Sequence, residues 1–286
     1  MERIVKINKA GSVESAAAER IKVLYSDLDG SMLGPGGNFF LSAEKEFTLL
    51  PSKALLSLKE KGVDITLVSG RSVIQLKEIS RVLGIDNYIA EAGCQIVHSN
   101  GEIKQAYKYE HGDSQTLYEA ITTSGAPAFL LDGYKEKLEY HTPWSNDRSC
   151  SHLFRGEIDL ADANNRLFKA GFEKLKLIDN GRVHRKGDLK DVNEVHSYHL
   201  LPSEIDKAAA ITIDANNRDF AVERRAAIGD SLADLSMADV VGMFFLIDNN
   251  DFLSTESDEL LENTLLTTEK MGLGWAEAAN YIADQK

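Results

Sequence analysis

The sequence has few cysteines, no long apolar run and a deficit of positive charge. Its 286 residues include only two cysteines, Cys94 and Cys150, which are far apart in the chain. Two distant thiols predict neither a disulfide framework nor a clustered metal-thiolate site. No apolar run approaches the roughly 18–20 residues of a membrane span, and the start lacks the apolar stretch of a signal peptide. The default expectation is a cytoplasmic protein with no membrane partner.

The charge balance restricts the partners further. The 32 Lys and Arg residues are outnumbered by 45 Asp and Glu residues, which gives a formal net charge of −13. Nucleic-acid surfaces need a basic footprint, so no nucleic-acid partner is expected. The same charge opposes the approach of an anionic substrate. If the ligand is a phosphate, a metal cation and a few well-placed basic residues must offset the acid locally.

Two carboxylates follow the first strongly apolar segment of the chain. Residues 21–25 predict a buried strand, and Asp27, Asp29 and Gly30 come where that strand ends. Carboxylates crowded at a strand's carboxyl end repel each other unless a cation or a proton lies between them. In open α/β sheets this end is also where ligands bind. A solvated acidic turn is the plainer alternative for this pattern taken alone.

Helical and strand patterns alternate on both sides of a less regular middle region. Before residue 95 the patterns predict a helix over 51–61, a strand over 63–68, a helix ending at Gly84 and a strand over 88–90. After residue 200 they predict a helix over 203–213, strands over 225–228 and 240–247, and helices over 234–238 and 276–283. Such alternation favours a parallel sheet with right-handed crossovers.

The middle region mixes short strands, helices and turn signals. Asn100-Gly101 predicts a hairpin within residues 96–107, and Asn180-Gly181 predicts a second turn after a strand over 174–179. We therefore expect an inserted α+β domain over 98–200. The rest forms one α/β core from residues 1–97, with an extension over 1–19, and residues 201–286.

Four groups of polar residues have the chemistry of a phosphoryl-transfer site. They are Asp27-Leu28-Asp29-Gly30-Ser31, Ser69-Gly70-Arg71, Lys207, and Gly229-Asp230 with Asp234 four residues after Asp230. Together they supply a carboxylate nucleophile, an acid/base, a hydroxyl, an ammonium and a distal acidic pair. In phosphoryl transfer the protein mainly positions groups and neutralises charge.

At these positions the sequence resembles the haloacid dehalogenase superfamily of phosphatases. SDLDGSML is similar to its first motif, LVSGR to the second, EIDKAAAI to the third and IGDSLADLSMA to the fourth. The resemblance covers residues of about 20–95 and 200–286. The long gap between Ser69 and Lys207 resembles the class II (type IIB) cap of Cof-like sugar-phosphate, sucrose-phosphate and mannosyl-3-phosphoglycerate phosphatases. It implies a Rossmann-like parallel-sheet core with an inserted α+β cap.

The resemblance also implies a role for each matching position. Asp27 would attack phosphorus, and Asp29 would protonate the leaving oxygen and then activate water. Mg²⁺ would be held by Asp27, Asp230 and the Asp29 carbonyl group, with Asp234 orienting these ligands. The residues implied in phosphate binding are Asp27, Gly30, Ser31, Ser69, Gly70, Arg71 and Lys207.

Several positions depart from the family pattern or keep two interpretations. Ser31 replaces the usual Thr, Ala233 stands where many relatives have Asn, and Glu91-Ala92-Gly93 replaces Glu-Asn-Gly. Arg71 is equally expected to bind the phosphate or to pair with an acidic residue on the surface. Core or hinge packing is favoured for His196 and His199, and a small buried apolar role for Cys94. Trp144 either contacts substrate or fills the cap core, and Arg148 contacts substrate or is a surface charge. The residues able to read a substrate's leaving group are Glu139, His141, Arg148, Lys176 and His184.

The leading hypothesis is a Mg²⁺-dependent phosphomonoester hydrolase acting on a small phosphorylated metabolite, with a sugar phosphate favoured. A phosphosugar mutase of the phosphomannomutase type is the alternative enzyme, and it should need extra basic residues in the cap. A phosphate-binding protein without turnover is the non-enzyme alternative, which the complete set of site residues disfavours. The sequence makes no prediction of the oligomeric state.

Overall fold

The chain divides into two compact units. The computed structural model describes residues 5–6, 20–106, 109, 116–183, 187–190, 192–249 and 262–285. The first unit comprises Met1–Ser69, Ile85–Asn87 and Ile211–Lys286, and the second comprises Gly70–Gly84 and Tyr88–Ala210. The division predicted at residues 97/98 and 200/201 stays a prediction. Among the described helices, none has the length and apolar character that a membrane crossing requires.

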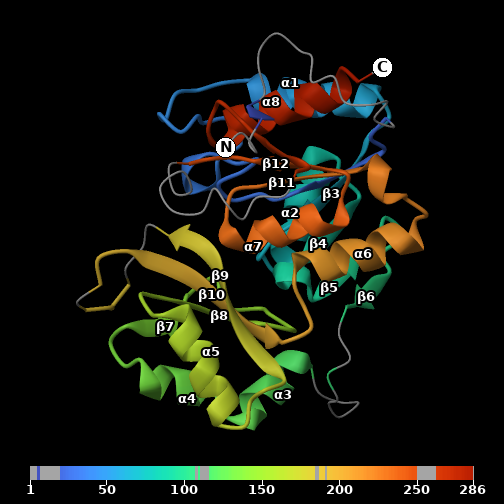
Figure 1. The fold of residues 1–286 in the computed structure, drawn as a ribbon. Coiled ribbons are helices and arrows are strands. Elements are labelled where there is room, and N and C mark those ends of the chain that lie inside the picture. The colour runs from blue at the N-terminus through green and yellow to red at the C-terminus, as the bar shows by residue number, and fades with distance from the viewer. Residues whose placement is uncertain are drawn as a thin grey trace. The chain divides into compact units, whose positions relative to one another are not determined.

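A parallel sheet forms the centre of the first unit, as predicted (Figure 1). Its strands follow the spatial order β1 (Val5–Lys6), β13 (Thr264–Leu266), β12 (Met243–Leu246), β11 (Arg225–Gly229), β2 (Val23–Ser26) and β3 (Asp64–Val68). All four residues of β2 are buried. A strand buried on both faces reads as a continuous apolar run, which is why the sequence revealed it.

Two helices of the first unit lie side by side, α1 (Leu50–Glu60) and α8 (Met271–Ala283) (Figure 1). The predicted start of α8 at residue 276 is wrong, because Gly272 and Gly274 are helical and buried. A Cβ at Gly272 would lie 3.1 Å from Pro51 Cγ, so this glycine allows the close approach to α1. The remaining helical segments here are short: α7 (Leu232–Leu235) and 3₁₀ turns at Pro35–Gly37, Val222–Arg224 and Ser236–Val240.

The helix α6 (Lys207–Asn217) starts later than predicted and crosses from the second unit into the first. Asp206 caps it, because its Oδ1 accepts a hydrogen bond from the Ala209 amide at 2.8 Å. The predicted start at residue 203 is therefore replaced by a capped start at Lys207.

The second unit contains α2 (Val73–Leu83), the strands β5 (Gln95–Val97) and β6 (Ile103–Gln105), and β4 (Asn87–Ala90) from its second residue onward. Ser72 and Gln75 form a capping box at the start of α2, and Gly84 ends the helix in the left-handed conformation, with φ of 64°. The antiparallel pair β5 and β6 confirms the hairpin predicted from Asn100-Gly101.

The rest of the second unit is an antiparallel sheet with helices, as predicted for the insertion. Its strand order is β7 (Leu138–Tyr140), β8 (His152–Gly156), β10 (Val195–Pro202) and β9 (Leu175–Val183), and its helices are α3 (Leu117–Ser124), α4 (Ala126–Gly133) and α5 (Leu160–Lys169). Their fully buried core includes Leu130, Phe154, Leu167 and Leu200. Cys94 and Cys150 are buried in the same core, which confirms the small apolar role expected for Cys94.

The turn predicted at Asn180-Gly181 is wrong, because β9 continues through it. Tyr198 pairs with Asp179 and His196 with Arg182, so two residues of β9 face Ser197 alone. This is a β-bulge, and Gly181 has the positive φ, 93°, that such bulges favour. The Asp179 carboxylate accepts a hydrogen bond from the Gly181 amide at 2.8 Å and fixes the local bend.

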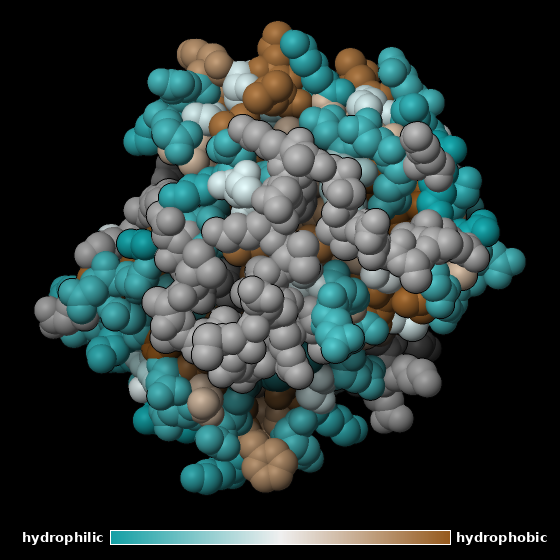
Figure 2. All heavy atoms as spheres, turned by 45° about the horizontal axis from the view of Figure 1, so that its top comes forward, coloured by the Kyte–Doolittle hydropathy of each residue, from teal (hydrophilic) through white to brown (hydrophobic). Residues whose placement is uncertain are grey.

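One face of the molecule is drawn with its side chains coloured by hydropathy. Figure 2 shows mostly hydrophilic side chains on the face drawn, with hydrophobic ones in separate spots among them. Separate apolar side chains are normal on soluble proteins and need no partner to explain them.

Candidate active site

Three neighbouring strands of the first unit bring the predicted residues to one edge of the sheet. β2 lies between β11 and β3, and Ser26 pairs with both Ile228 and Leu67. Asp27 follows β2 directly, Asp230 follows β11, and Ser69 follows β3. Because parallel strands end on the same side, all three residues lie at the carboxyl edge, where α/β sheets bind ligands.

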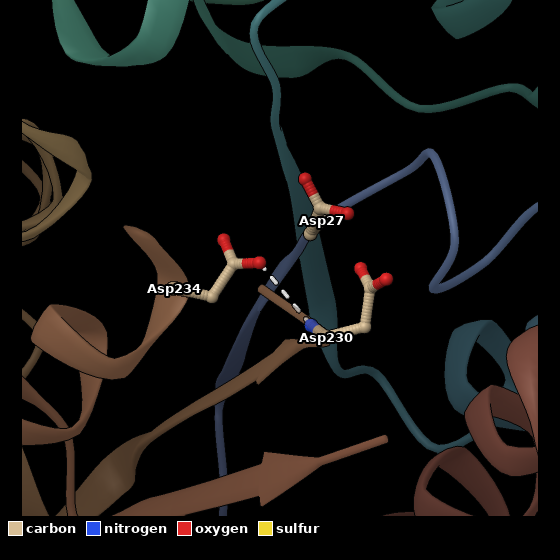
Figure 3. A group of neighbouring side chains, drawn as sticks. All are labelled: Asp27, Asp230 and Asp234. Atoms are coloured by element: carbon tan, nitrogen blue, oxygen red, sulfur yellow. Dashed lines mark hydrogen bonds between the residues drawn. The ribbon is translucent and has the colours of Figure 1, made fainter. Parts of the chain in front are cut away.

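Three carboxylates meet at this edge. Asp27, Asp230 and Asp234 each offer an oxygen atom, and these atoms lie within 4.8 Å of one another. Asp27 is 5% exposed and Asp234 is fully buried, whereas Asp230 is half-buried. Figure 3 shows the three side chains converging, with Asp27 following β2, Asp230 following β11 and Asp234 on α7. Like charges this close and this buried favour a cation or a proton among them.

Asp234 holds the loop that carries Asp230. Its Oδ2 atom accepts hydrogen bonds from the Asp230 amide at 3.1 Å and the Ser231 amide at 2.9 Å (Figure 3). The Ser231 hydroxyl donates to the same oxygen at 2.6 Å. A Cβ at Gly229 would overlap the Asp234 side chain, so a glycine is needed there. Asp234 thereby fixes the position of Asp230.

Asp230 receives hydrogen bonds from two neutral groups. The Ser31 hydroxyl donates to its Oδ1 at 2.9 Å, and the Asn249 amide donates to its Oδ2 at 2.9 Å. Asn249 also donates to the Gly30 carbonyl group at 2.9 Å. Gly30 has a φ of 87°, and a Cβ there would overlap the Asp230 carboxylate. The sequence reasoning missed Asn249, which no predicted motif contains.

Two buried side chains, those of Ser26 and Trp275, fix the backbone at Asp27. The Ser26 hydroxyl donates to the Asp27 carbonyl group at 2.8 Å, and the Trp275 indole donates to the Ser26 hydroxyl at 2.8 Å. The Asp27 amide donates to the Ile228 carbonyl group at 3.0 Å. The sequence patterns assigned no role to Trp275, and in the structure its indole supports the loop at Asp27 through Ser26.

Asp27 and Asp29 occupy different environments despite their close spacing. Asp27 is buried, whereas Asp29 is exposed, and Leu28 between them is fully buried. The Leu28 carbonyl group accepts hydrogen bonds from the Ser31 and Leu33 amides, at 3.3 and 2.9 Å, which folds this segment into a tight turn. One carboxylate is therefore held in place while the other faces solvent.

The other predicted site residues, Gly70, Arg71 and Lys207, belong to the second unit. Lys207 is 1% exposed at the first position of α6. The Gly70 carbonyl group accepts a hydrogen bond from Arg148 Nη2 at 2.8 Å. The Arg71 carbonyl group accepts one from the Glu91 amide at 2.9 Å. Glu91 and Arg148 thus fix the backbone of the second predicted motif.

Glu91 is the centre of a buried polar network that the sequence did not reveal. Its carboxylate accepts hydrogen bonds from the amides of Ser149, Cys150 and Ser151, at 3.0, 3.1 and 2.7 Å. It also lies 3.9 Å from Arg148 Nη1, and both side chains of this pair are 1% exposed. Arg148 is therefore a buried partner of Glu91 and not a surface charge. Burial lowers the pKa of Arg148 and the Glu91 charge opposes that shift.

The other residues expected to read substrate have varied surroundings. Glu139 lies 2.6 Å from Arg155 Nη2, and Lys176 Nζ lies 3.6 Å from Asp206 Oδ2. His141 is buried at 8% exposure and Trp144 is 47% exposed. His184 lies outside the described residues.

The chemistry of the three-carboxylate group fits a divalent hard cation. Asp27, Asp230 and Asp234 offer oxygen atoms only, which are the ligands that Mg²⁺ prefers. Asp234 already uses one oxygen for the loop amides, so it suits an orienting role beside Asp27 and Asp230.

Comparison with known proteins gives the family. The family model of haloacid dehalogenase-like hydrolases matches residues 24–252. A phosphoglycolate phosphatase from Pyrobaculum islandicum is 24% identical over 264 residues, which are 92% of this chain and 96% of that relative. An HMP-PP phosphatase from Escherichia fergusonii is 24% identical over 78% of this chain and 82% of its own.

Solved structures show the same fold. The sucrose-phosphatase from Synechocystis, solved with sucrose and phosphate, has a TM-score of 0.63 at 14% identity, and the match covers 92% of this chain and 98% of that one. A protein from Thermoplasma acidophilum has a TM-score of 0.62 at 18% identity, covering 92% and 99%. The chain therefore belongs to the haloacid dehalogenase-like hydrolases, which confirms the resemblance to that superfamily's phosphatases predicted from its motifs.

Proposed function

We propose that this enzyme is a Mg²⁺-dependent phosphomonoester hydrolase that acts on a small phosphorylated metabolite, with a sugar phosphate favoured. The observation that carries the proposal is the convergence of Asp27, Asp230 and Asp234 within 4.8 Å at the carboxyl edge of a parallel sheet. The family and the phosphatase names of the curated relatives support the same reaction class.

The chain's own residues account for both halves of the reaction. A carboxylate oxygen of Asp27 attacks phosphorus, and the bond from phosphorus to the leaving oxygen breaks as an aspartyl-phosphate forms. Asp29 gives a proton to the leaving oxygen, takes one from water, and the resulting hydroxide releases inorganic phosphate from Asp27. The fixed backbone of Asp27 and the exposed side chain of Asp29 suit these two roles.

The remaining predicted residues position and neutralise the phosphoryl group. Mg²⁺ bound by Asp27, Asp230 and the Asp29 carbonyl group would supply positive charge beside the transferring phosphoryl group. Ser69 donates a hydrogen bond to that group, and Lys207 offsets its charge. Ser31 holds Asp230 in place through its hydrogen bond, and Gly30 leaves room for the Asp230 carboxylate. Gly70 and Arg71 continue the phosphate-binding loop.

The proposed role of residues 98–200 is that of a cap that contacts the leaving group and excludes water. Support comes from the four-stranded antiparallel sheet of this segment, whose hydrophobic core also includes Ala92, Cys94, Leu201 and Ile205. With a cap of this kind, the residues at the sheet edge would carry the reaction chemistry and the inserted segment would determine which substrate binds.

The test of the nucleophile is the substitution Asp27→Asn. It removes the negative charge with little change in volume, so phosphate release in the presence of Mg²⁺ should fall by about 10³-fold or more, while the circular dichroism spectrum is kept. A phosphoryl-mimicking beryllium fluoride complex should bind the parent protein and not this variant. Asp86→Asn, at an exposed position, is the matched control and should keep the parent rate. Residual activity within tenfold of the parent would place the nucleophile elsewhere.

A further inference from the structure

A polar network joins the helix α6 to two strands of the parallel sheet. The Tyr25 hydroxyl on β2 donates to Asp214 Oδ2 on α6 at 2.8 Å. Arg218, which directly follows α6, donates from Nε to the same oxygen at 3.1 Å. Its two terminal nitrogens donate to Asp64 Oδ2 and Thr66 Oγ1 on β3, both at 2.8 Å. Because Tyr25, Thr66 and Asp214 are each 0% exposed, the network fixes α6 against β2 and β3 through buried groups.

The network leaves little freedom for α6 to move along the sheet. Burial and the negative charge of Asp214 raise the pKa of Tyr25, so the hydroxyl keeps its proton and donates it. A shift of α6 by one residue along its axis, about 1.5 Å, would part Asp214 from Tyr25 and Arg218 from β3. Each lost contact would leave a buried polar group unpaired, which is unfavourable. The network therefore sets the register of α6 along the two strands.

Lys207 lies on the face of α6 that the network holds. It precedes Asp214 by two helical turns, so both residues lie on one side of the helix, about 10.5 Å apart along its axis. Lys207 is 1% exposed, and Ala210 and Ile211, which lie between the two on this side, are 0% exposed. One continuous helix therefore transmits its register to Lys207.

The two strands carry proposed site residues directly after the network. Asp27 follows Tyr25 by two positions, and Ser69 follows Thr66 by three. Two strand residues span about 6.6 Å, so the hydrogen bond from Tyr25 fixes α6 to β2 close to the proposed nucleophile.

We propose that Tyr25, Asp214 and Arg218, the register triad, are positioning residues that hold Lys207 where it offsets the charge of the transferring phosphoryl group. This inference rests on the proposed function. The triad acts through Lys207, because its hydrogen bonds fix the helix whose first residue is Lys207. Displacing such a group by about 1 Å can lower the rate on the order of 10²-fold.

A second triad of the same chemistry provides the matched control. The Tyr134 hydroxyl donates to Asp162 Oδ2 at 2.7 Å, and Arg166 Nε lies 2.8 Å from the same oxygen. In both triads the arginine follows the aspartate by four positions. The control triad joins Tyr134, directly after α4, to α5. Tyr134→Phe therefore removes the same kind of hydrogen bond as Tyr25→Phe without altering a contact of α6.

The experiment is a double-mutant cycle in kcat/KM for p-nitrophenyl phosphate with Mg²⁺ present. Tyr25→Phe should lower this value about 10-fold and Arg218→Met about 10–100-fold, whereas Tyr134→Phe should change it less than about twofold. In a Lys207→Ala background, Tyr25→Phe and Arg218→Met should each cost less than about threefold, because the group that they position is already absent. Tyr25→Phe removes one neutral hydroxyl and leaves Arg218 on Asp214, so it keeps the test decisive if Arg218→Met fails to fold.

The outcomes separate the proposed function from the register triad. If the parent releases phosphate from neither p-nitrophenyl phosphate nor any other phosphomonoester, the proposed function and this inference both fail. If the parent is active and Lys207→Ala keeps the parent rate, the role of Lys207 and this inference fail, while Asp27→Asn still tests the nucleophile. If Tyr25→Phe costs nothing, or costs the same factor with and without Lys207, this inference alone fails.

Discussion

The sheet edge of the first unit and the Glu91 network of the second hold buried carboxylates in opposite ways. In the second unit, Glu91 is surrounded by three backbone amides and the guanidinium group of Arg148, so its charge is offset within the chain. In the first unit, Asp27, Asp230 and Asp234 gather close together, and Asp230 receives its hydrogen bonds from a neutral hydroxyl and a neutral amide. The first arrangement stabilises the fold by itself. Under the proposed function, a bound cation would offset the charge of the second.

The difference separates stability from ligand binding. Removing a carboxylate that has a partner within the chain should mainly lower the free energy of unfolding, because the partner is left buried without its counter-charge. A carboxylate grouped with others should matter most for metal binding and turnover, because removing one relieves repulsion among the rest. Substitutions in the two places should therefore affect different measurements.

The largest expected effect on stability comes from Glu91→Gln. The amide group keeps one acceptor but sets an NH₂ group against amides that also donate, and it leaves Arg148 buried without its counter-charge. The free energy of unfolding in urea should fall by about 3–5 kcal/mol. Glu78→Gln, in an exposed pair with Arg81, is the control and should change it by less than about 1 kcal/mol.

A double variant sharpens this prediction. Glu91→Gln combined with Arg148→Met removes both charges, so its loss of stability should be smaller than the sum of the two single losses. Strict additivity would show that Glu91 and Arg148 act independently, and that the charge of Glu91 is not offset by Arg148.

A pH effect of about 3 kcal/mol should arise from His152 in the second unit. Burial lowers the pKa of this histidine from 6.5 to about 4. Because the folded form binds the proton less well than the unfolded form, stability is present above pH 6.5 and is lost as the pH falls toward 4. His199 acts in the same direction, whereas Asp179 raises the pKa of His196 and acts in the opposite one.

The measurement is urea unfolding between pH 7 and pH 4.5. The slope of stability against pH should be shallower in His152→Gln than in the parent, by up to about 1.4 kcal/mol per pH unit. Parallel pH curves for the two proteins would mean that His152 binds its proton equally well in the folded and unfolded states, against the lowered pKa.

Mg²⁺ should stabilise the parent protein by about 2.7 kcal/mol at a concentration one hundred times its Kd. EDTA should reverse this stabilisation and stop turnover. Asp230→Asn should abolish most of the shift in Tm, while Asp86→Asn should keep it. Full activity after exhaustive chelation would contradict the metal site.

The smallest effect is expected from Asn249→Ala. Asn249 joins the Asp230 carboxylate to the Gly30 carbonyl group, and its Oδ1 accepts from the Met271 amide at 3.1 Å. Losing it should free Asp230 and raise the Mg²⁺ concentration needed for half-maximal activity by about 10–100-fold. Thr268→Ala, near the same turn but bonded to Glu277, should leave that concentration unchanged.

The sequence was most informative where the structure depends on local pattern. The strands β2, β3, β11 and β12 and the hairpin of β5 and β6 follow from short apolar runs and turn residues, so they could be predicted, whereas β1 and β13 were missed. The carboxylates Asp27 and Asp230 could be placed at one sheet edge because each directly follows a buried run. The carboxyl ends of the strands are sufficient to predict that these two carboxylates lie at the same edge.

The supporting residues could not be found in this way. Asn249 and Trp275 contact residues more than two hundred positions away, at Gly30 and Ser26. The sequence indicated that Arg148 is a surface charge or contacts substrate, because its partner Glu91 lies 57 residues earlier in the chain. Asn180-Gly181 has the residue types of a turn, but in the structure these two residues form a β-bulge in β9 where it pairs with β10. Local patterns carry no information about such partners.

The indole of Trp275 also sets the order in which the loop at Asp27 can be completed during synthesis. Ser26 leaves the ribosome long before the helix that carries Trp275 exists, since 249 positions separate the two. At typical elongation rates of about 5–20 residues per second, that gap lasts roughly 12–50 s. During this interval the loop at Asp27 of the growing chain lacks the hydrogen bond from Trp275. A newborn chain of this protein should therefore become able to bind beryllium fluoride only after its last helix has docked.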